Sequence, residues 1–206
     1  MHEEGTIGPS APHAPSCIGC NLIVISGPSG AGKTTVSRAL PARLDLLVSI
    51  SATTRPPRKG EVDGVDYYFL TPEEFKARAA ANRFVEWAEV FGHCYGTPIE
   101  GLERARESGR MLLLEIDVQG GIQIKKKFPE ALAILLLPPD DQALRERLSR
   151  RGTESPQDVQ RRFAMAQEEV RMARQSRCYD VEIVNDQLAA TVNEVVSVIQ
   201  TRRKQA

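Results

Sequence analysis

The chain has 206 residues, of which 41% are apolar and 26% charged, the usual composition of a soluble domain with a single core. Lysine plus arginine and aspartate plus glutamate each number 27, so the zero net charge does not indicate nucleic-acid or membrane binding. No apolar run approaches the roughly 20 residues that span a bilayer, and the N-terminus lacks the pattern of a secretory signal. We therefore expect a cytoplasmic protein with no nucleic-acid or membrane partner.

Residues 1–20 form a tail of glycine, proline and small residues without periodicity. We expect this tail to be disordered, and a partner-binding arm is the alternative. Cys17 and Cys20 form a lone C-x-x-C pair, and a zinc site would need two further ligands. We expect reduced thiols here, with metal or redox chemistry as the alternative.

The stretch from residue 21 to 40 predicts a phosphate-binding loop between a strand and a helix. Residues 22–25 are an apolar run of the length of a buried parallel strand. Residues 33–40 place apolar side chains on one helical face, and the helix is predicted to continue to residue 44. Residues 27–34 between them fit G-x-x-x-x-G-K-[ST], in which backbone N–H groups and a helix N-terminus face phosphate oxygens. A chance glycine turn is the alternative, and the flanking strand and helix argue against it.

The residue types of this loop suit a nucleoside triphosphate. We expect Lys33 to reach the β- and γ-phosphates, and Thr34 to contact Mg²⁺, mostly through water and the ATP phosphates. The residues of this segment expected to bind ATP are Gly27, Pro28, Ser29, Gly30, Ala31, Gly32, Lys33, Thr34 and Thr35.

The rest of the chain alternates strand and helix patterns after a charged insertion. Thr71, Pro72 and Glu74 are typical of a capped helix start. Strands are predicted at residues 46–50, 84–90, 111–117, 131–137 and 180–186, and a turn at 91–98. Helices are predicted at residues 71–81, 99–108, 121–127, 140–150, 156–176 and 188–202. This order predicts an α/β fold with a parallel sheet, in which ligands bind at the carboxyl ends of the strands.

Charged residues suited to phosphoryl transfer occur outside the loop. Two carboxylates end the strand at 111–117, where they suit the surroundings of Mg²⁺. The insertion carries two arginines beside tyrosines, and nine arginines lie between residues 145 and 177, although such a run is usually a solvated helix face. The residues singled out are Arg55, Arg58, Tyr67, Tyr95, Glu115, Asp117, Arg147, Arg151 and Arg162.

Together these stretches resemble the guanylate kinase family. The resemblance rests on SGPSGAGKTT, SATTRPPRKGEVDGVDYYF, FVEWAEVFGHCYGT, LLLEIDVQGG, RLSRRGTE and VEIVND, in this order over residues 21–202. It implies phosphorylation of GMP and dGMP by ATP with Mg²⁺ on a P-loop kinase fold, a parallel β-sheet core flanked by helices. The implied domain, residues 21–206, has a core (21–50, 99–140 and 166–206), a mixed α/β GMP-binding insertion (51–98) and a helical lid (141–165).

The resemblance also implies residue roles on the acceptor side. Two arginines and two tyrosines are implied to hold the GMP phosphate, and Ser51, Glu86 and Thr97 to recognise the base. The implied GMP-binding residues are Ser51, Arg55, Arg58, Tyr67, Glu86, Tyr95, Thr97, Glu115 and Asp117.

The chemistry of Glu86 fits guanine. Guanine presents N1–H and an N2 amino group as donors on one edge, and a carboxylate only accepts, so it accepts from both. Adenine has an acceptor at N1 and would face the carboxylate with repulsion. The hydroxyls of Ser51 and Thr97 are expected to donate to guanine O6. On spacing alone, Glu86 would be an exposed strand carboxylate; the surrounding motif favours the functional interpretation.

On the donor side the resemblance implies a lid that closes over the triphosphate. Asn185 and Asp186 are implied to lie near the adenine, and Arg151 to bind ATP. The residues implied to be catalytic are Lys33, Arg58, Arg147 and Arg162.

The sequence departs from the family pattern at two positions in these motifs. Glu115 stands where many relatives have Asp, which moves the charge by about 1.5 Å. Cys94 stands where relatives often have Tyr, and we expect it to be a packing change.

Two alternatives to a guanylate kinase remain at this point. A non-catalytic guanylate-kinase-like binding module would typically have a damaged phosphate loop, and the loop here is intact. A related kinase with another phosphorylated acceptor, such as ribose bisphosphate, would not need a guanine-recognising carboxylate. For the oligomeric state we expect a monomer or a homodimer.

Overall fold

The computed structural model describes residues 21–90, 92–149 and 156–205. The expected tail, Cys17, Cys20 and Arg151 lie outside these residues. Within them, no helix is long and apolar enough to cross a membrane.

The core is a five-stranded sheet in the order β2-β7-β1-β8-β9, and every pairing in it is parallel. Its strands are β1 (Leu22–Ser26), β2 (Leu46–Val48), β7 (Met111–Glu115), β8 (Leu132–Leu137) and β9 (Val181–Val184). All five residues of β1 are buried, as expected of a central parallel strand with helices on both faces. The predicted α/β fold with a parallel sheet is therefore confirmed.

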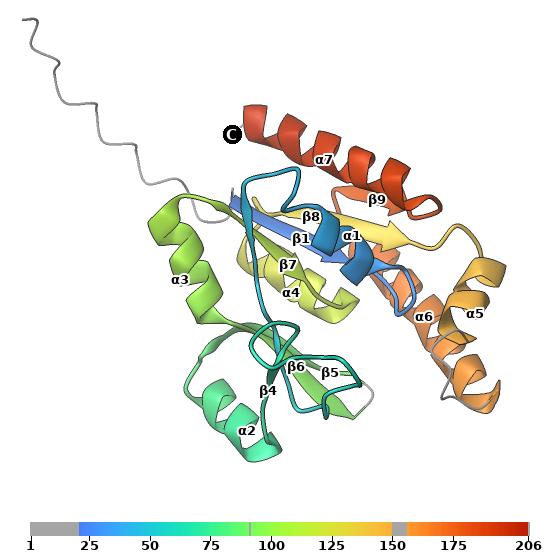
Figure 1. Ribbon diagram of the computed structural model, residues 1–206, viewed down its shortest axis with the longest axis horizontal. Coiled ribbons are helices and arrows are strands. Elements are labelled where there is room, and N and C mark those ends of the chain that lie inside the picture. Colours follow the sequence, from blue (N-terminus) through green and yellow to red (C-terminus); the bar gives the residue numbers. More distant parts are fainter. Residues whose placement is uncertain (1–20, 91, 150–155, 206) are drawn as a thin grey trace, which may run out of the picture.

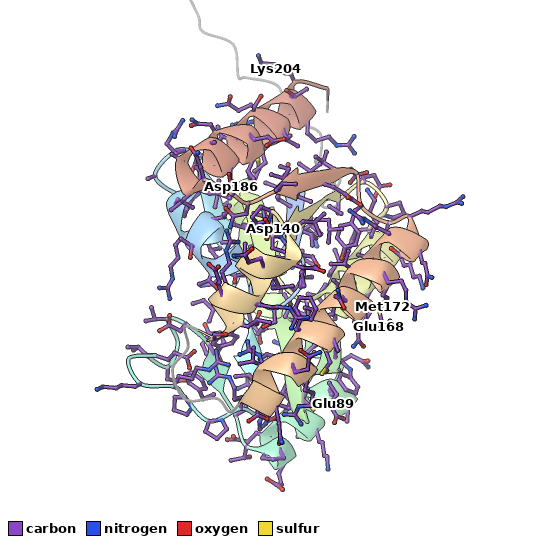
Figure 2. The ribbon with its side chains drawn as sticks, turned by 90° about the vertical axis from the view of Figure 1, so that its right-hand side faces the viewer. Glu89, Asp140, Glu168, Met172, Asp186 and Lys204 are labelled. Atoms are coloured by element: carbon purple, nitrogen blue, oxygen red, sulfur yellow. The ribbon has the colours of Figure 1, made fainter. Side chains whose placement is uncertain are left out.

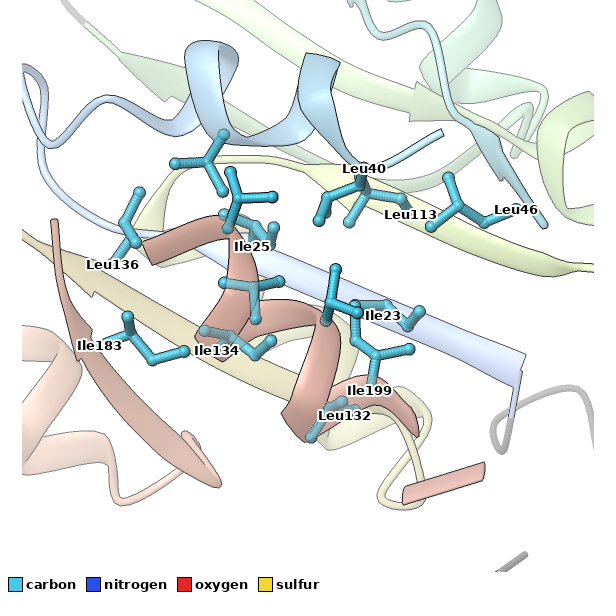
Figure 3. Close-up of a cluster of buried hydrophobic side chains, with 14 of the residues drawn as sticks. Ile23, Ile25, Leu40, Leu46, Leu113, Leu132, Ile134, Leu136, Ile183 and Ile199 are labelled. Carbon is cyan, nitrogen blue, oxygen red and sulfur yellow. The ribbon is translucent and has the colours of Figure 1, made fainter. Parts of the chain in front are cut away.

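Helices cover both faces of this sheet (Figure 1). On one face, α1 (Lys33–Ala39) and α7 (Leu188–Gln205) pack against Ile23 and Ile25 of β1 in a large aliphatic cluster (Figure 3). On the other face, residues 22 and 24 of the same strand belong to a second cluster. The helices on that side are α3 (Ile99–Ser108), α4 (Val118–Lys127) and α6 (Pro156–Ser176). The alternation of side chains along one strand thus supplies both halves of the core.

The insertion forms a smaller unit beyond the carboxyl ends of the core strands (Figure 1). Its sheet has the order β4-β3-β6-β5. Its elements are β3 (Ala52–Thr53), β4 (Tyr68–Phe69), α2 (Pro72–Ala80), β5 (Phe84–Val90) and β6 (His93–Pro98). Phe75 and Phe84 stack at 4.5 Å between ring centroids in its small core, and Cys94 packs against that core, as expected.

The predicted cap of α2 is confirmed. The Thr71 hydroxyl accepts from the amide of Glu74, and the Glu74 carboxylate accepts from the amide of Thr71. Both bonds satisfy amides that have no partner within the helix.

The predicted turn at residues 91–98 is wrong, because β6 occupies most of this stretch and pairs antiparallel with β5 and β3. Gly96 and Pro98 disfavour a strand by propensity, and tertiary pairing outweighs that preference. A Cβ on Gly96 would lie 3.0 Å from both Phe84 and Trp87, so the glycine permits the close approach of β5.

Two predicted helix boundaries also differ. α1 ends at Ala39, because Pro41 cannot continue the hydrogen bonding of the helix. α4 begins at Val118, three residues earlier than expected, because the side chain of Asp117 caps it by accepting from the amide of Gly120 at 2.9 Å. The two glycines of its first turn disfavour a helix by propensity, so the sequence predicts a later start.

The last segment with a positional role is α5 (Asp141–Ser149), which packs on α6. Leu144 and Leu148 of α5 form a buried cluster with Phe163 and Ala166 of α6. Figure 2 views the molecule from this side, with Glu168 and Met172 labelled on α6.

Candidate functional site

A cavity of about 1360 Å³ lies between the core sheet and the insertion. It is lined by the phosphate loop, the start of α1, the ends of β2 and β7, the insertion and residues of α5 and α6. These elements meet where the carboxyl ends of the parallel strands meet, the usual ligand position in such a sheet.

The phosphate loop joins β1 to α1 as predicted. Gly32, the residue before the helix, has φ 91°, a conformation that favours glycine, and a Cβ there would lie 2.3 Å from the Asn185 side chain. Asn185 is buried, and its amide donates to Ala31 O at 2.8 Å. The position of Asn185 next to the loop is thus explained by a contact to the loop backbone, while the side chain of Asp186 is exposed.

Lys33 folds back over the loop that it follows. Its ammonium donates to the carbonyls of Gly27 at 2.6 Å and Pro28 at 3.2 Å. A cation is thereby held at the phosphate loop, where a phosphate chain would pass.

Thr34 and Glu115 meet at the start of α1. The Thr34 hydroxyl donates to Glu115 Oε1 at 2.5 Å, so the longer acid that ends β7 reaches the loop directly. Asp117 lines the cavity beside it. A hydroxyl and carboxylates are the hard oxygen donors that Mg²⁺ prefers, so these residues fit that ion. Among the described residues, no group of three His, Cys, Asp or Glu side chains could hold a metal alone.

Helix α6 contacts the loop through two side chains on one face. Arg162 donates to the Ser29 hydroxyl at 2.8 Å, and Glu169, seven residues further on, accepts from the Ser29 amide at 3.1 Å. Burial raises the pKa of the Glu169 carboxyl, and the nearby Lys33 opposes that rise. The sequence analysis missed Glu169, which the two-turn spacing from Arg162 could have indicated.

Arg147 also reaches the donor side. Its guanidinium donates to Asn185 O at 2.7 Å and to Ala31 O at 3.5 Å. Arg147 and Arg162, both implied to be catalytic, therefore lie at the loop, while Arg151, implied to bind ATP, lies outside the described residues.

The arginines of the insertion are organised by Glu61, which the sequence analysis also missed. The Arg55 guanidinium donates to both oxygens of Glu61 at 2.9 Å, and the Arg58 amide donates to Glu61 at 2.7 Å. Arg55 is buried and lies 5.5 Å from the centroid of the Tyr67 ring. The Arg58 side chain is exposed.

Two tyrosines complete this part of the cavity. The rings of Tyr67 and Tyr95 lie edge to face with centroids 6.2 Å apart. Burial raises the pKa of Tyr67 to about 12, so its hydroxyl stays a hydrogen-bond donor near neutral pH. With the two arginines they form a set of donors suited to a phosphate monoester.

Glu86 is the buried carboxylate of the cavity, only 5% exposed. β5 and β6 place it directly opposite Thr97, whose hydroxyl donates to Glu86 Oε1 at 2.6 Å. Because Thr97 is fully buried and its hydroxyl is bonded to Glu86, it orients Glu86 and does not face the cavity. Ser51, in contrast, lines the cavity. Burial raises the pKa of Glu86 to about 7; the Thr97 hydrogen bond opposes this rise and the charge of Asp117 adds to it.

All but five of the predicted site residues in the described part of the chain line one cavity. Gly27, Pro28 and Ala31 are buried within the phosphate loop, Thr97 lies behind Glu86, and the side chain of Asp186 is exposed. One end of the cavity presents the phosphate loop and cations. The other end presents hydrogen-bond donors suited to a phosphate, together with a buried carboxylate. Such an arrangement suits two anionic nucleotides bound face to face.

Comparisons with known proteins agree with this arrangement. A family model of guanylate kinase matches residues 19–202. The chain is 46% identical over 183 residues to a guanylate kinase of Symbiobacterium thermophilum, covering 88% of this chain and 85% of that protein. It is 49% identical over 168 residues to one of Thermosynechococcus vestitus, covering 81% and 86%.

A solved structure extends the agreement to the fold. The crystal structure of guanylate kinase from Anaplasma phagocytophilum superposes with a TM-score of 0.71 at 30% identity, covering 87% of this chain and 84% of that one. The fold is thus that of a P-loop kinase, and the chain belongs to the guanylate kinase family.

Proposed function

We propose that the protein transfers the γ-phosphoryl group of ATP to GMP, and to dGMP, giving ADP and GDP or dGDP. The observation that carries this proposal is Glu86, a buried carboxylate in the cavity that also contains an intact phosphate loop. Because a carboxylate accepts from two donors, it suits the N1–H and N2 edge of guanine and disfavours adenine.

The phosphate of GMP would bind among Arg55, Arg58, Tyr67 and Tyr95. Glu61 already aligns the Arg55 guanidinium and the Arg58 backbone there. A planar guanidinium group can donate to two phosphate oxygens at once. The insertion would therefore fix the orientation of the phosphate as well as its position. Ser51, which lines the cavity, would donate to the base.

ATP would lie along the phosphate loop, with Lys33, Arg147 and Arg162 neutralising its charge. Closure of the insertion and lid would bring a GMP phosphate oxygen in line with the γ-phosphorus and exclude water. No side-chain base is needed, because the GMP phosphate is already an anionic nucleophile at neutral pH. The chain's contribution is positioning and charge neutralisation.

A bound Mg²⁺ supplies neutralisation of the phosphate oxygens. Thr34 and Glu115 would hold it, with Asp117 beside them, mostly through water and ATP phosphates. Glu115 thus takes a place on the donor side in this proposal, since it contacts Thr34.

The three functional parts are proposed with the boundaries expected from the sequence. The core is residues 21–50, 99–140 and 166–206, the GMP-binding insertion 51–98 and the lid 141–165. The apolar cluster of the insertion supports its boundaries, because Ala52, Phe75 and Phe84 all belong to it. The α5–α6 cluster joins the proposed lid to Ala166, the first residue of the last core segment. We further propose a cytoplasmic location and a monomer or homodimer.

One assay separates this function from its alternatives. ADP release is coupled to a spectrophotometric readout with GMP, dGMP, AMP or ribose bisphosphate as acceptor. The proposal predicts turnover with GMP and dGMP and little with the other two. Preferred turnover of ribose bisphosphate would support the other kinase activity, and GMP binding without ADP release would support a non-catalytic module.

A further inference from the structure

Gly120, in the first turn of α4, is a glycine whose backbone does not require one. Seven glycines of the described residues have positive φ, and Gly120 is not among them. Alanine is the better helix former at such a position, because glycine loses more backbone freedom on folding. What the residue type provides must therefore be space.

The space beside Gly120 is occupied by the carboxylate of Glu86. A Cβ on Gly120 would lie 2.7 Å from Glu86 Oε2, closer than real Cβ atoms lie to such neighbours, and 3.1 Å from its Cδ, a tight contact. The same Cβ would lie 3.4 Å from the Cβ of Ile116, an ordinary van der Waals contact, so the steric conflict is with Glu86.

Neither partner in this contact is free to retreat. On the far side of the carboxylate, Thr97 donates to Oε1 at 2.6 Å. The amide of Gly120 donates to Asp117 Oδ1 at 2.9 Å, which fixes the helix start. Glu86 is thus held between a hydroxyl on β6 and the bare backbone of α4.

We propose that Gly120 is a specificity-determining residue: because it has no side chain, the Glu86 carboxylate can pack against the backbone of α4 in the orientation that faces the guanine base. This inference rests on the proposed function of Glu86. An added methyl group would displace the Glu86 carboxylate from this position. Its two oxygens would then no longer accept from N1–H and N2 of guanine together.

The next residue offers a matched control. Gly121 lies in the same helical turn and also lacks a positive φ. A Cβ there would meet the Tyr179 hydroxyl at 2.5 Å and Ser26 at 3.2 Å, on the side of β1. Gly121→Ala therefore adds the same methyl group to the same helix without touching Glu86.

The test compares kcat/KM for GMP and for AMP in wild type, Gly120→Ala and Gly121→Ala, with KM for ATP measured alongside. We expect Gly120→Ala to lower the preference for GMP about tenfold or more, the size of a lost charge-assisted pair, through a higher KM for GMP. KM for ATP should stay within about twofold. Gly121→Ala should keep the wild-type preference, whatever it does to thermal stability.

A double variant distinguishes a steric effect on Glu86 from damage to the helix. Glu86→Asp withdraws the carboxylate by about 1.5 Å, roughly one methylene. Adding Gly120→Ala to Glu86→Asp should then cost less than about threefold in GMP preference.

An equal penalty on both backgrounds, or an unchanged preference in Gly120→Ala, would overturn the inference. A wild-type protein that does not prefer GMP over AMP would instead overturn the proposed function itself, so the two failures are distinguishable.

Discussion

The two ends of the cavity are built in different ways. The donor end is a local structure, in which one strand, one loop and one helix within residues 22–39 place Lys33 at the phosphate loop. The acceptor end is assembled from side chains of strands and loops that meet only in the folded insertion. Thr97 and Glu86, for example, are eleven residues apart and are joined by cross-strand pairing.

The difference suggests a division of labour. Every nucleoside triphosphate has the same phosphates, so a backbone cradle binds them without recognising the base. Recognition of one base requires a particular donor and acceptor pattern, which only side chains supply. Substitutions at the donor end should therefore abolish turnover with every acceptor, and substitutions at the acceptor end should change which acceptor is used.

The largest expected effect is that of Lys33→Ala. Removing the cation over the loop should lower kcat about a thousandfold, comparable to losing a transition-state donor. GMP binding should stay largely intact, because Glu86 and Arg55 are untouched. ADP release measures the loss, Lys126→Ala on the exposed side of α4 is the control, and normal turnover in Lys33→Ala would refute the assignment.

Glu86→Gln should act on selectivity. The amide keeps one acceptor and introduces a donor, so kcat/KM for GMP should fall about a hundredfold while that for AMP changes little. Glu89→Gln is the matched control, since Glu89 lies on the same strand with an exposed side chain (Figure 2). Unchanged discrimination against AMP in Glu86→Gln would contradict the base-recognition role.

The pH dependence should report the same carboxylate. Burial raises the pKa of Glu86 to about 7, so the group is mostly protonated in the free enzyme below that pH. Binding guanine then requires loss of a proton, and kcat/KM for GMP should fall about tenfold per pH unit between pH 6.5 and about 5. In Glu86→Gln this fall of kcat/KM at low pH should vanish. An identical pH profile in both proteins would contradict the assignment of the fall to Glu86.

These results bear on how much the sequence alone could predict. The donor end was predictable almost residue by residue, since a strand, a glycine loop and a helix start are consecutive in the chain. The acceptor residues were named through family resemblance, but their connections were not. Glu61 carries no motif of its own, and its role appears only when Arg55 and Arg58 converge on it.

The fold shows the same limit. Apolar runs and the Thr71 cap identified the core strands and α2, because those signals are local. Strand β6 was missed, because its glycine and proline argue for a turn and only pairing with β5 makes it a strand. Glu169 was missed for a related reason, since its partner Ser29 lies 140 positions away in the sequence.

A smaller effect is expected for Glu61→Ala. Arg55 would lose its bidentate partner, and its guanidinium would be less well aligned for the GMP phosphate. KM for GMP should rise about fivefold with KM for ATP unchanged. Steady-state kinetics would check this, with the exposed Glu103→Ala on α3 as control; an equal rise in both constants would point to general misfolding.

The smallest effect is expected for Thr71→Ala. Loss of the cap of α2 should lower the free energy of unfolding by about 1 kcal/mol, because the amide of Glu74 loses its acceptor. Thermal unfolding should register this change, while the ratio of GMP to AMP turnover stays at the wild-type value. A shifted ratio would show that the insertion's fold and its base recognition are not separable.

The most direct test of the division between the two ends is calorimetric binding of ATP and of GMP, each alone, to wild type, Lys33→Ala and Glu86→Gln. We expect a crossed result: Lys33→Ala loses ATP affinity and keeps GMP affinity, whereas Glu86→Gln loses GMP affinity and keeps ATP affinity. Loss of both ligands in both variants would contradict it.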